Sequence, residues 1–323
     1  MSDTTESFTH ISVLGEEAPE ALVVNPDGLY IDATFGRGGH SRRILQKLSS
    51  AGRLIAFDRD PEAIQAAASL KDARFRIIHR PFSQMSEALA NLGIHEVDGV
   101  FLDIGVSSPQ IDDATRGFSF RYDGPLDMRM DTTTGQTAAE WLQSASEAEI
   151  KRVIHVYGEE RYAGAIARAI VKARQTQPFT HTLALANLVA SVVPKNYKDP
   201  HQHPATRTFQ AIRIEINHEL DELRTALERA TALLVPQGRL AVITFHSLED
   251  RVVKQFFEDK AHPERQIDSR LPLTNDQLPQ PLYDSLQRIR PSREEGERNP
   301  RSRSAILRVG VRTATPYLGE VKP

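Results

Sequence analysis

The chain has 323 residues, of which 40% are hydrophobic and 26% charged, as expected for a folded globular protein of one large or two ordinary domains. A formal net charge of −3 gives no overall case for nucleic-acid binding, so such a case must rest on local patches. The absence of cysteine excludes disulfides, thiol nucleophiles and Cys-ligated zinc, and it fits a reducing cytoplasm. The first ten residues are polar and lack the apolar segment of a secretory signal, so we predict a cytoplasmic protein.

The first third of the chain alternates strand-like and helix-like segments. We predict strands at 29–35, 53–58, 74–79 and 97–103. Helices are predicted between them, beginning near His40, Pro61 and Ser83. Apolar strands separated by short helices indicate parallel βαβ units that are buried on both faces.

This alternation stops after the fourth strand and resumes much later. Loops are predicted over 107–135 and helices over 137–193, followed by one long amphipathic helix over 203–234. A fifth strand is predicted at 239–245, a helix at 249–261, and two late strands at 283–291 and 304–312. The pattern predicts an α/β protein: a Rossmann-like sheet domain, residues 1–106 and 208–323, interrupted by a helical insert, residues 107–207.

A glycine-rich turn follows the first predicted strand. Gly36, Gly38 and Gly39 allow a sharp turn and close approach of a ligand, and the helix beginning near His40 favours an anion at its N-terminus. Asp58 ends the second strand, where an acid can accept hydrogen bonds from both ribose hydroxyls. Together these residues predict a site for a nucleoside-containing cofactor, although an ordinary glycine turn would explain the glycines alone.

The spacing favours S-adenosylmethionine over NAD. A dinucleotide fingerprint places a third glycine where this chain has Ser41, although serine is also small. S-adenosylmethionine has no pyrophosphate, and a glycine turn at a helix N-terminus can hold its carboxylate. The late pair of strands is more typical of methyltransferases than of dehydrogenases. Phe82, after the third strand, either flanks an adenine ring or packs in the core.

The fourth strand ends in an acid followed by small polar residues. Asp103 can accept hydrogen bonds from an amine of cofactor or substrate, and Ser107, Ser108 and Gln110 offer adaptable donors and acceptors. Because ligands of open α/β sheets bind at the carboxyl ends of strands, this segment is expected beside the cofactor. A serine turn before Pro109 is the alternative, but it leaves the acid at the end of a buried strand unexplained.

With these residues, the chain resembles the bacterial 16S ribosomal RNA (cytosine-N4)-methyltransferases of the MraW/RsmH-type family. The resemblance runs from His10 to about Arg312 and is carried by "DATFGRGGHS", "FDRDPEA", "DGVFLDIGVSSPQIDDATRGFSFRYDGPLDMRMD", "YGEERYAGAIARAI", "HPATRTFQAIRIEINHELDEL", "GRLAVITFHSLEDRVVKQFF" and "NPRSRSAILRV". One departure is Gln237, where the family usually has glycine.

The resemblance implies a class I methyltransferase that uses S-adenosylmethionine to methylate a cytidine in the decoding centre of 16S ribosomal RNA within the small subunit. It implies cofactor contacts at Gly38, Gly39, His40, Asp58, Phe82, Asp103 and Gln110. It also implies that the helical insert helps recognise RNA. No metal is required by this chemistry, and the sequence leaves open whether the protein forms a homodimer.

The expected reaction is an in-line displacement in which the cytosine amino nitrogen attacks the methyl carbon. That nitrogen is a poor nucleophile, so the enzyme must align it at roughly 3–3.5 Å from the methyl group. Acceptors for the amino hydrogens would free its lone pair, and we assign this role to Asp103, Ser107 and Ser108. If the cofactor amine occupies Asp103, one of the serines or a backbone carbonyl takes the role instead.

The target base must be splayed out of the RNA to reach such a site. Basic and aromatic residues interleave in the helical insert, as RNA contacts require. Our candidates are Arg161, Arg168, Lys172, Lys195, Tyr197, Lys198 and Arg207. The segment 288–303, with six arginines and three glutamates, is expected to add to this surface. The alternatives are a nicotinamide-dependent oxidoreductase and a ribosome-assembly factor that only binds RNA.

Overall fold

A computed structural model describes residues 12–194, 202–268, 274 and 277–319 of the chain. Contacts divide the chain into two compact units, each described by itself below. Unit 1 comprises residues 1–105 and 220–323, and unit 2 comprises residues 106–219.

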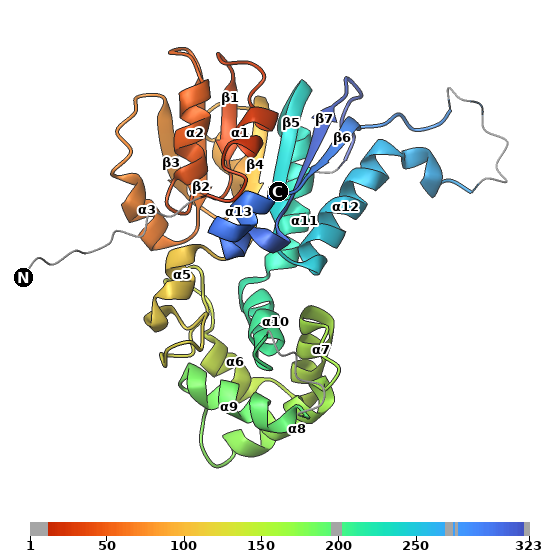
Figure 1. The fold of residues 1–323 in the computed structure, drawn as a ribbon. Helices are drawn as coiled ribbons and strands as arrows, with labels where there is room; N and C mark the ends of the chain where they lie inside the picture. The colour runs from red at the N-terminus through yellow and green to blue at the C-terminus, as the bar shows by residue number, and fades with distance from the viewer. Residues whose placement is uncertain (1–11, 195–201, 269–273, 275–276, 320–323) are drawn as a thin grey trace, which may run out of the picture. The chain divides into compact units, whose positions relative to one another are not determined.

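Unit 1 is built on a mixed sheet, which is seven-stranded within the described residues and has the order β3-β2-β1-β4-β5-β7-β6 (Figure 1). The strands are β1 (Leu29–Asp32), β2 (Arg53–Asp58), β3 (Phe75–His79), β4 (Val97–Asp103), β5 (Leu234–Thr244), β6 (Tyr283–Ile289) and β7 (Ile306–Arg312). The first five pair in parallel and β7 is antiparallel to both of its neighbours. The predicted α/β sheet with a late strand pair is therefore confirmed.

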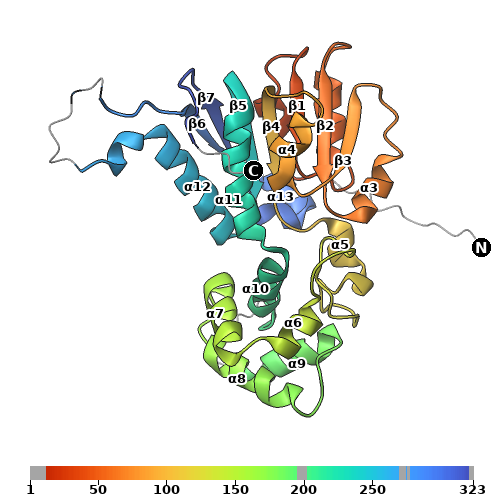
Figure 2. The same cartoon turned by 180° about the vertical axis from the view of Figure 1, so that it is seen from behind.

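Helices cover both faces of this sheet because successive strand residues point to opposite sides. Tyr30 and Phe101 pack in the cluster that includes α1 and α2, whereas Ile31 and Leu102 pack in the cluster that includes α4, α11 and α12. Figures 1 and 2 show these two helical layers from opposite sides. The helices of unit 1 are α1 (Glu17–Leu22), α2 (Gly39–Lys47), α3 (Pro61–Ala67), η1 (Phe82–Gln84), α4 (Met85–Ala90), α11 (Glu219–Leu233), α12 (Ser247–Ala261), η4 (Pro263–Gln266), α13 (Arg293–Arg298) and η5 (Pro300–Ser304).

Unit 2 is helical, which confirms a helical insertion between β4 and β5. Its helices are α5 (Ser108–Asp112), η2 (Ala114–Arg116), α6 (Ala138–Ser144), α7 (Glu147–Gly158), α8 (Ala163–Arg174), α9 (Thr182–Val192) and α10 (Thr206–Asn217). One hydrophobic cluster forms its core and contains Trp141. Met128 also belongs to this core.

The predicted single helix over 203–234 was wrong, because the chain breaks at His218 between α10 and α11. His218 adopts a left-handed conformation with φ of 50°. On either side, tertiary bonds fix the break: Asn217 Nδ2 donates to the Met128 carbonyl at 2.7 Å and Asn217 Oδ1 accepts from the Met130 N–H at 2.8 Å. The next residue, Glu219, is buried and accepts both of its hydrogen bonds from Arg213, at 2.8 and 2.9 Å.

The start of the fifth strand was also predicted wrongly. The strand was expected to begin at 239, after the predicted helix over 203–234, but β5 begins at Leu234 and includes Pro236–Gly238. Gln237 is accommodated there with φ of 70°, and the register between β4 and β5 shifts between Val97 and Gly99. The strand β5 therefore continues through Gln237, with a local irregularity at this residue, and does not begin after it.

Candidate functional site

The carboxyl end of β1 carries a fully buried carboxylate that the sequence analysis did not single out. Asp32 accepts hydrogen bonds from Ser41 Oγ at 2.5 Å and from the Thr34 N–H at 3.1 Å. Burial raises the pKa of Asp32 to about 6, and the hydrogen bond from Ser41 opposes this rise. The available signal was an acid ending an apolar strand, the same signal that drew attention to Asp103.

A side-chain hydrogen bond joins the ends of β1 and β4, in addition to the backbone bond from the Ala33 N–H to the Phe101 carbonyl at 2.8 Å. Thr34 Oγ1 accepts a hydrogen bond from the N–H of Asp103 at 2.6 Å. Beyond Asp103, Gly105 has φ of 118°, a conformation that favours glycine. The parallel order changes direction at β1 and β4, which is the point where ligands bind in open α/β sheets.

The glycine turn has the backbone geometry that the sequence predicted. Gly36 and Gly38 have φ of 57° and 74°, and Gly38 is the N-cap of α2. A Cβ at Gly38 would lie 2.7 Å from the Phe35 ring, so glycine is required there by packing as well as by conformation. A Cβ at Gly36 would meet nothing within 4 Å, so this side of the turn is open. At Gly39 the corresponding space is filled by Ser12 Oγ.

Asp58 ends β2, as predicted, and is held against the glycine turn. Its two carboxylate oxygens accept the N–H of Gly36 at 2.7 Å and of Asp60 at 2.9 Å. Burial raises the pKa of Asp58, and these two backbone donors oppose the rise. One backbone donor on each oxygen leaves acceptor capacity for a ligand.

His40 and Asp103 form the part of the site with unmet hydrogen-bonding capacity. The His40 ring is buried against Phe101, with ring centroids 4.6 Å apart, and His40 Nε2 lies 3.4 Å from Asp103 Oδ2. Within the described residues, neither His40 ring nitrogen nor the buried Oδ1 of Asp103 makes a hydrogen bond. Because buried polar atoms are nearly always paired, these atoms fit a ligand that brings donors and acceptors of its own.

The other predicted site residues of this region have local structural partners. Phe82 is partly buried and packs against the hydrophobic cluster on the α4 side of the sheet. In unit 2, Gln110 is buried, and its Oε1 accepts the Ser107 N–H at 2.9 Å as the capping box of α5. Ser108 is the first residue of that helix and is partly exposed. Their roles in cofactor or substrate binding stay predictions.

His246, just after the end of β5, is the N-cap of α12. Its Nδ1 accepts the Glu249 N–H at 3.4 Å, and its Nε2 lies 2.8 Å from the fully buried Oε1 of Glu249. Glu249 Oε2 in turn accepts the Phe245 N–H at 2.8 Å. These contacts give His246 a structural role at the start of the helix.

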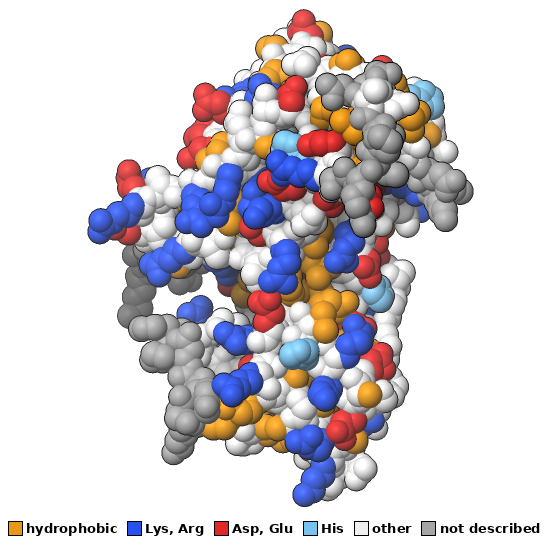
Figure 3. Space-filling model, turned by 90° about the vertical axis from the view of Figure 1, so that its right-hand side faces the viewer, with side chains coloured by type: hydrophobic (Ala, Val, Ile, Leu, Met, Phe, Trp, Pro, Cys, Tyr) orange, Lys and Arg blue, Asp and Glu red, His pale blue; other side chains and the backbone are white. Residues whose placement is uncertain are grey.

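The predicted RNA-contacting residues that the structure describes lie on the surface of unit 2. Arg168 and Lys172 are exposed on α8, Arg161 is exposed before it, and Arg207 is exposed on α10. Lys195, Tyr197 and Lys198 lie outside the described residues. On the face drawn in Figure 3, Lys and Arg side chains are interspersed with Asp and Glu. The RNA surface therefore stays a prediction.

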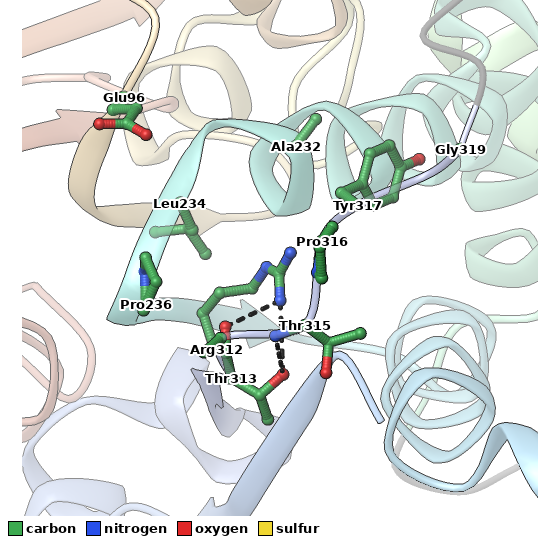
Figure 4. Close-up of a pocket in the computed structure, with 11 residues that line it drawn as sticks. Glu96, Ala232, Leu234, Pro236, Arg312, Thr313, Thr315, Pro316, Tyr317 and Gly319 are labelled. Carbon is green, nitrogen blue, oxygen red and sulfur yellow. Dashed lines mark hydrogen bonds between the residues drawn. The ribbon is translucent and has the colours of Figure 1, made fainter. Parts of the chain in front are cut away.

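A pocket in unit 1 lies at the amino ends of the parallel strands β4 and β5. Its lining includes Glu96 before β4, Leu234 at the start of β5 and Arg312 at the end of β7 (Figure 4). The buried Arg312 donates to backbone carbonyls of Thr231 and Leu282, both at 3.3 Å. It therefore ties the end of α11 to the strand pair. The cofactor candidates are at the other, carboxyl ends of the parallel strands.

The strand order, the glycine turn and the acids ending β1, β2 and β4 define a class I methyltransferase, which uses S-adenosylmethionine. Residues 7–313 match the model of the MraW methylase family. The chain belongs to this family.

Curated relatives match over nearly the whole chain. A protein of Methylobacillus flagellatus named ribosomal RNA small subunit methyltransferase H is 57% identical, over 94% of this chain and 95% of its own. A protein of the same name from Janthinobacterium is 55% identical over 96% and 97%. Among solved structures, an rRNA methylase from Streptococcus thermophilus covers 93% of each chain with 11% identity and a TM-score of 0.39. The fold assignment rests on the strand order rather than on that last similarity.

No helix within the described residues is long and apolar enough to cross a bilayer. No group of three His, Asp or Glu side chains in the described ranges is arranged to hold a metal ion.

Proposed function

We propose that the protein transfers a methyl group from S-adenosylmethionine to the exocyclic N4 of a cytidine in the decoding centre of 16S ribosomal RNA. The match to the MraW methylase family over residues 7–313 carries this proposal. The names of the curated relatives support the small-subunit ribosomal RNA as substrate. The choice of cytidine N4 comes from the sequence resemblance. We place the reaction in the cytoplasm.

The cofactor is held at the carboxyl ends of β1, β2 and β4. S-adenosylmethionine, when bound, supplies a methyl group activated by a sulfonium centre. The turn of Gly38, Gly39 and His40 binds its carboxylate at the N-terminus of α2. Asp58 accepts the ribose hydroxyls, for which each of its oxygens has capacity left. Within the part of the chain that the structure describes, Asp103 Oδ1 has no hydrogen-bond partner, which supports a role in accepting an amine.

Phe82 and Gln110 complete the proposed cofactor contacts. Phe82 is partly buried at the start of η1, directly after the end of β3, and would flank the adenine ring. Gln110, whose oxygen accepts the Ser107 N–H at 2.9 Å, is the remaining proposed contact.

Substrate chemistry requires acceptors for the hydrogens of the cytosine amine. Asp103, Ser107 and Ser108 are our candidates, because they follow one another at the end of β4 and the start of α5. An acceptor on an amino hydrogen withdraws the proton as the nitrogen becomes bonded to carbon, and it orients the lone pair. The buried position of His40 beside Asp103 favours a fixed carboxylate orientation.

The helical insert, residues 107–207, is our candidate for RNA recognition. Exposed cations at Arg161, Arg168, Lys172 and Arg207 would contact phosphates, together with Lys195, Tyr197 and Lys198. Their role is to hold an RNA segment whose target base is splayed out. Each single arginine or lysine contributes weakly, so the surface as a whole should set affinity.

The test is transfer of a labelled methyl group to purified, unmethylated small ribosomal subunits and, in parallel, to free 16S RNA. We expect the label in a single N4-methylated cytidine when the modified nucleoside is mapped. Asp103→Ala should lower the rate at least about 100-fold, because it removes a group at the reacting end of the site. Asp284→Ala, which changes an exposed acid on the edge strand β6, is the matched control.

Two results would contradict the proposal. Absence of label, or a label on another atom, would refute the assigned reaction. Undiminished transfer by Asp103→Ala, with unchanged affinity for S-adenosylmethionine, would remove Asp103 from both of its roles. Binding of NAD in preference to S-adenosylmethionine would instead favour an oxidoreductase.

A further inference from the structure

Three aromatic residues alternate along the loop after η2, and the structure separates them. Phe118 and Phe120 are partly buried and pack against the core of unit 2. Phe120 stands against Phe209, with ring centroids 4.7 Å apart. Tyr122 is not part of that core and is 66% exposed. The two-residue spacing alone would predict the same burial for all three rings. The exposure of Tyr122 is therefore set by the tertiary structure.

The backbone under Tyr122 is fixed, although its ring is exposed. The buried Thr182, at the start of α9, donates its Oγ1–H to the Tyr122 carbonyl at 3.3 Å and its N–H to the Gly124 carbonyl at 2.9 Å. Asp123 Oδ1 accepts the Leu183 N–H at 3.1 Å. A ring on a fixed loop loses little conformational freedom when a ligand stacks on it.

The side chains near Tyr122 along the chain and across the bridge are charged and polar as well as apolar. Arg121 and His181 are exposed, Leu183 is 37% exposed, and His181 is placed there by the bridge between Pro125 and His181. We call Arg121, Tyr122, His181 and Leu183 the Tyr122 surface. Arg121 and Asp123 flank Tyr122 along the chain and are both exposed, so polar side chains of both charges adjoin the ring. Such a surface suits a flat group with polar edges.

We infer that Tyr122 stacks on an unpaired base of the RNA substrate, with Arg121 beside the adjoining backbone. This inference rests on the proposed function and adds the stacking residue to it. The Tyr122 ring is exposed and its neighbour along the chain is the exposed Arg121, and aromatic rings with cations nearby are what sequence-tolerant base stacking uses. A protein partner would need a larger apolar patch than one ring and one partly exposed leucine.

The experiment compares the full-length wild type with Tyr122→Ala, Tyr122→Phe and Tyr122→Trp. Binding of a labelled single-stranded oligoribonucleotide is measured by fluorescence anisotropy, and KM and kcat are measured on small subunits. Val156→Ala, which shortens an exposed side chain on α7, is the matched control. Thermal melts confirm that each variant is folded.

For Tyr122→Ala we expect an affinity for the oligoribonucleotide about 10-fold lower and a similar rise in KM for subunits, with kcat and the KM for S-adenosylmethionine unchanged. Phe and Trp at 122 should retain wild-type binding, because both have an aromatic face. Unchanged binding by Tyr122→Ala would overturn the inference, as would equal losses in the Phe and Ala variants. Weaker subunit binding with unchanged RNA binding would assign the surface to a ribosomal protein instead. If the wild type itself transfers no methyl group, that result refutes the proposed function, whereas the results above refute only the role of Tyr122.

Discussion

Asp32 is a buried carboxylate at the end of β1 whose surroundings change its pKa. It is fully buried, and it shares this region of the sheet with His40 and Asp103, whose charges act on it in opposite directions. The bond from Ser41 explains why the third position of the glycine motif is serine: the hydroxyl donates to Asp32, which a glycine could not do.

We predict that Asp32 makes stability fall as pH rises. Its folded-state pKa is about 6, above the unfolded value of about 3.9, so the folded state binds more protons between these values. The free energy of unfolding should therefore decrease from about pH 4 to above pH 6, by up to about 3 kcal/mol from this group. Urea unfolding of wild type and Asp32→Asn across that range measures it.

In that experiment the stability of Asp32→Asn relative to wild type should rise with pH. Asp284→Asn, an exposed acid on β6, is the control and should follow the wild-type curve. Parallel curves for wild type and Asp32→Asn would show that Asp32 has an ordinary pKa.

At the scale of elements, left-handed residues mark the places where helices and strands depart from the sequence pattern. Non-glycine residues with positive φ include His218 between α10 and α11 and Gln237 in β5. Apolar periodicity continues through His218, so periodicity alone cannot reveal the break there. The conformation is fixed by contacts from distant segments, such as those of Asn217 with Met128 and Met130.

We expect Gln237→Gly to stabilise the protein by about 0.5–1 kcal/mol, because glycine adopts positive φ without the steric cost that Gln237 bears. Gln237 is exposed, so the substitution removes no buried contact. Gln237→Ala retains a Cβ and is the matched control. Denaturant unfolding at constant pH measures both, and equal stability of the Gly and Ala variants would refute the strain at this position.

At the scale of the whole molecule, the two units carry different parts of the proposed activity. The glycine turn, Asp58 and Asp103 all belong to unit 1, and the exposed basic side chains and the Tyr122 surface belong to unit 2. The single tryptophan, Trp141, lies in the core of unit 2 and so provides a spectroscopic signal for that unit alone.

We predict that S-adenosylmethionine at 100 times its Kd stabilises the protein by about 2.7 kcal/mol, which corresponds to a rise in Tm of roughly 5–10 °C by far-UV circular dichroism. Asp58→Ala should lose most of this rise, whereas Asp284→Ala should keep it. Trp141 fluorescence in the same scan reports whether unit 2 unfolds with unit 1. An equal rise for wild type and Asp58→Ala would place the cofactor elsewhere.

Much of the fold and of the candidate site could be read from the sequence, because local rules govern both. Apolar strands alternating with helices predict a parallel sheet, and acids or glycines at strand ends mark the edge where parallel strands finish together. Asp58, Asp103 and the glycine turn were identified in this way. The capping box of Ser107 and Gln110 was also predictable, as serine followed three residues later by glutamine, but we assigned these residues to ligand contacts and gave a serine turn before Pro109 as the alternative.

The sequence by itself determined the class of sheet, the helical insertion and the strand ends that hold the cofactor candidates, because these depend on local periodicity and chain direction. Only the tertiary structure decided where the long helix breaks, that β5 includes Gln237, that Asp32 is buried beside His40 and Asp103, and that Tyr122 is exposed while Phe118 and Phe120 are not. These outcomes depend on which distant groups form hydrogen bonds with each buried polar atom and fill each apolar space. No local stretch of residues determines those long-range contacts.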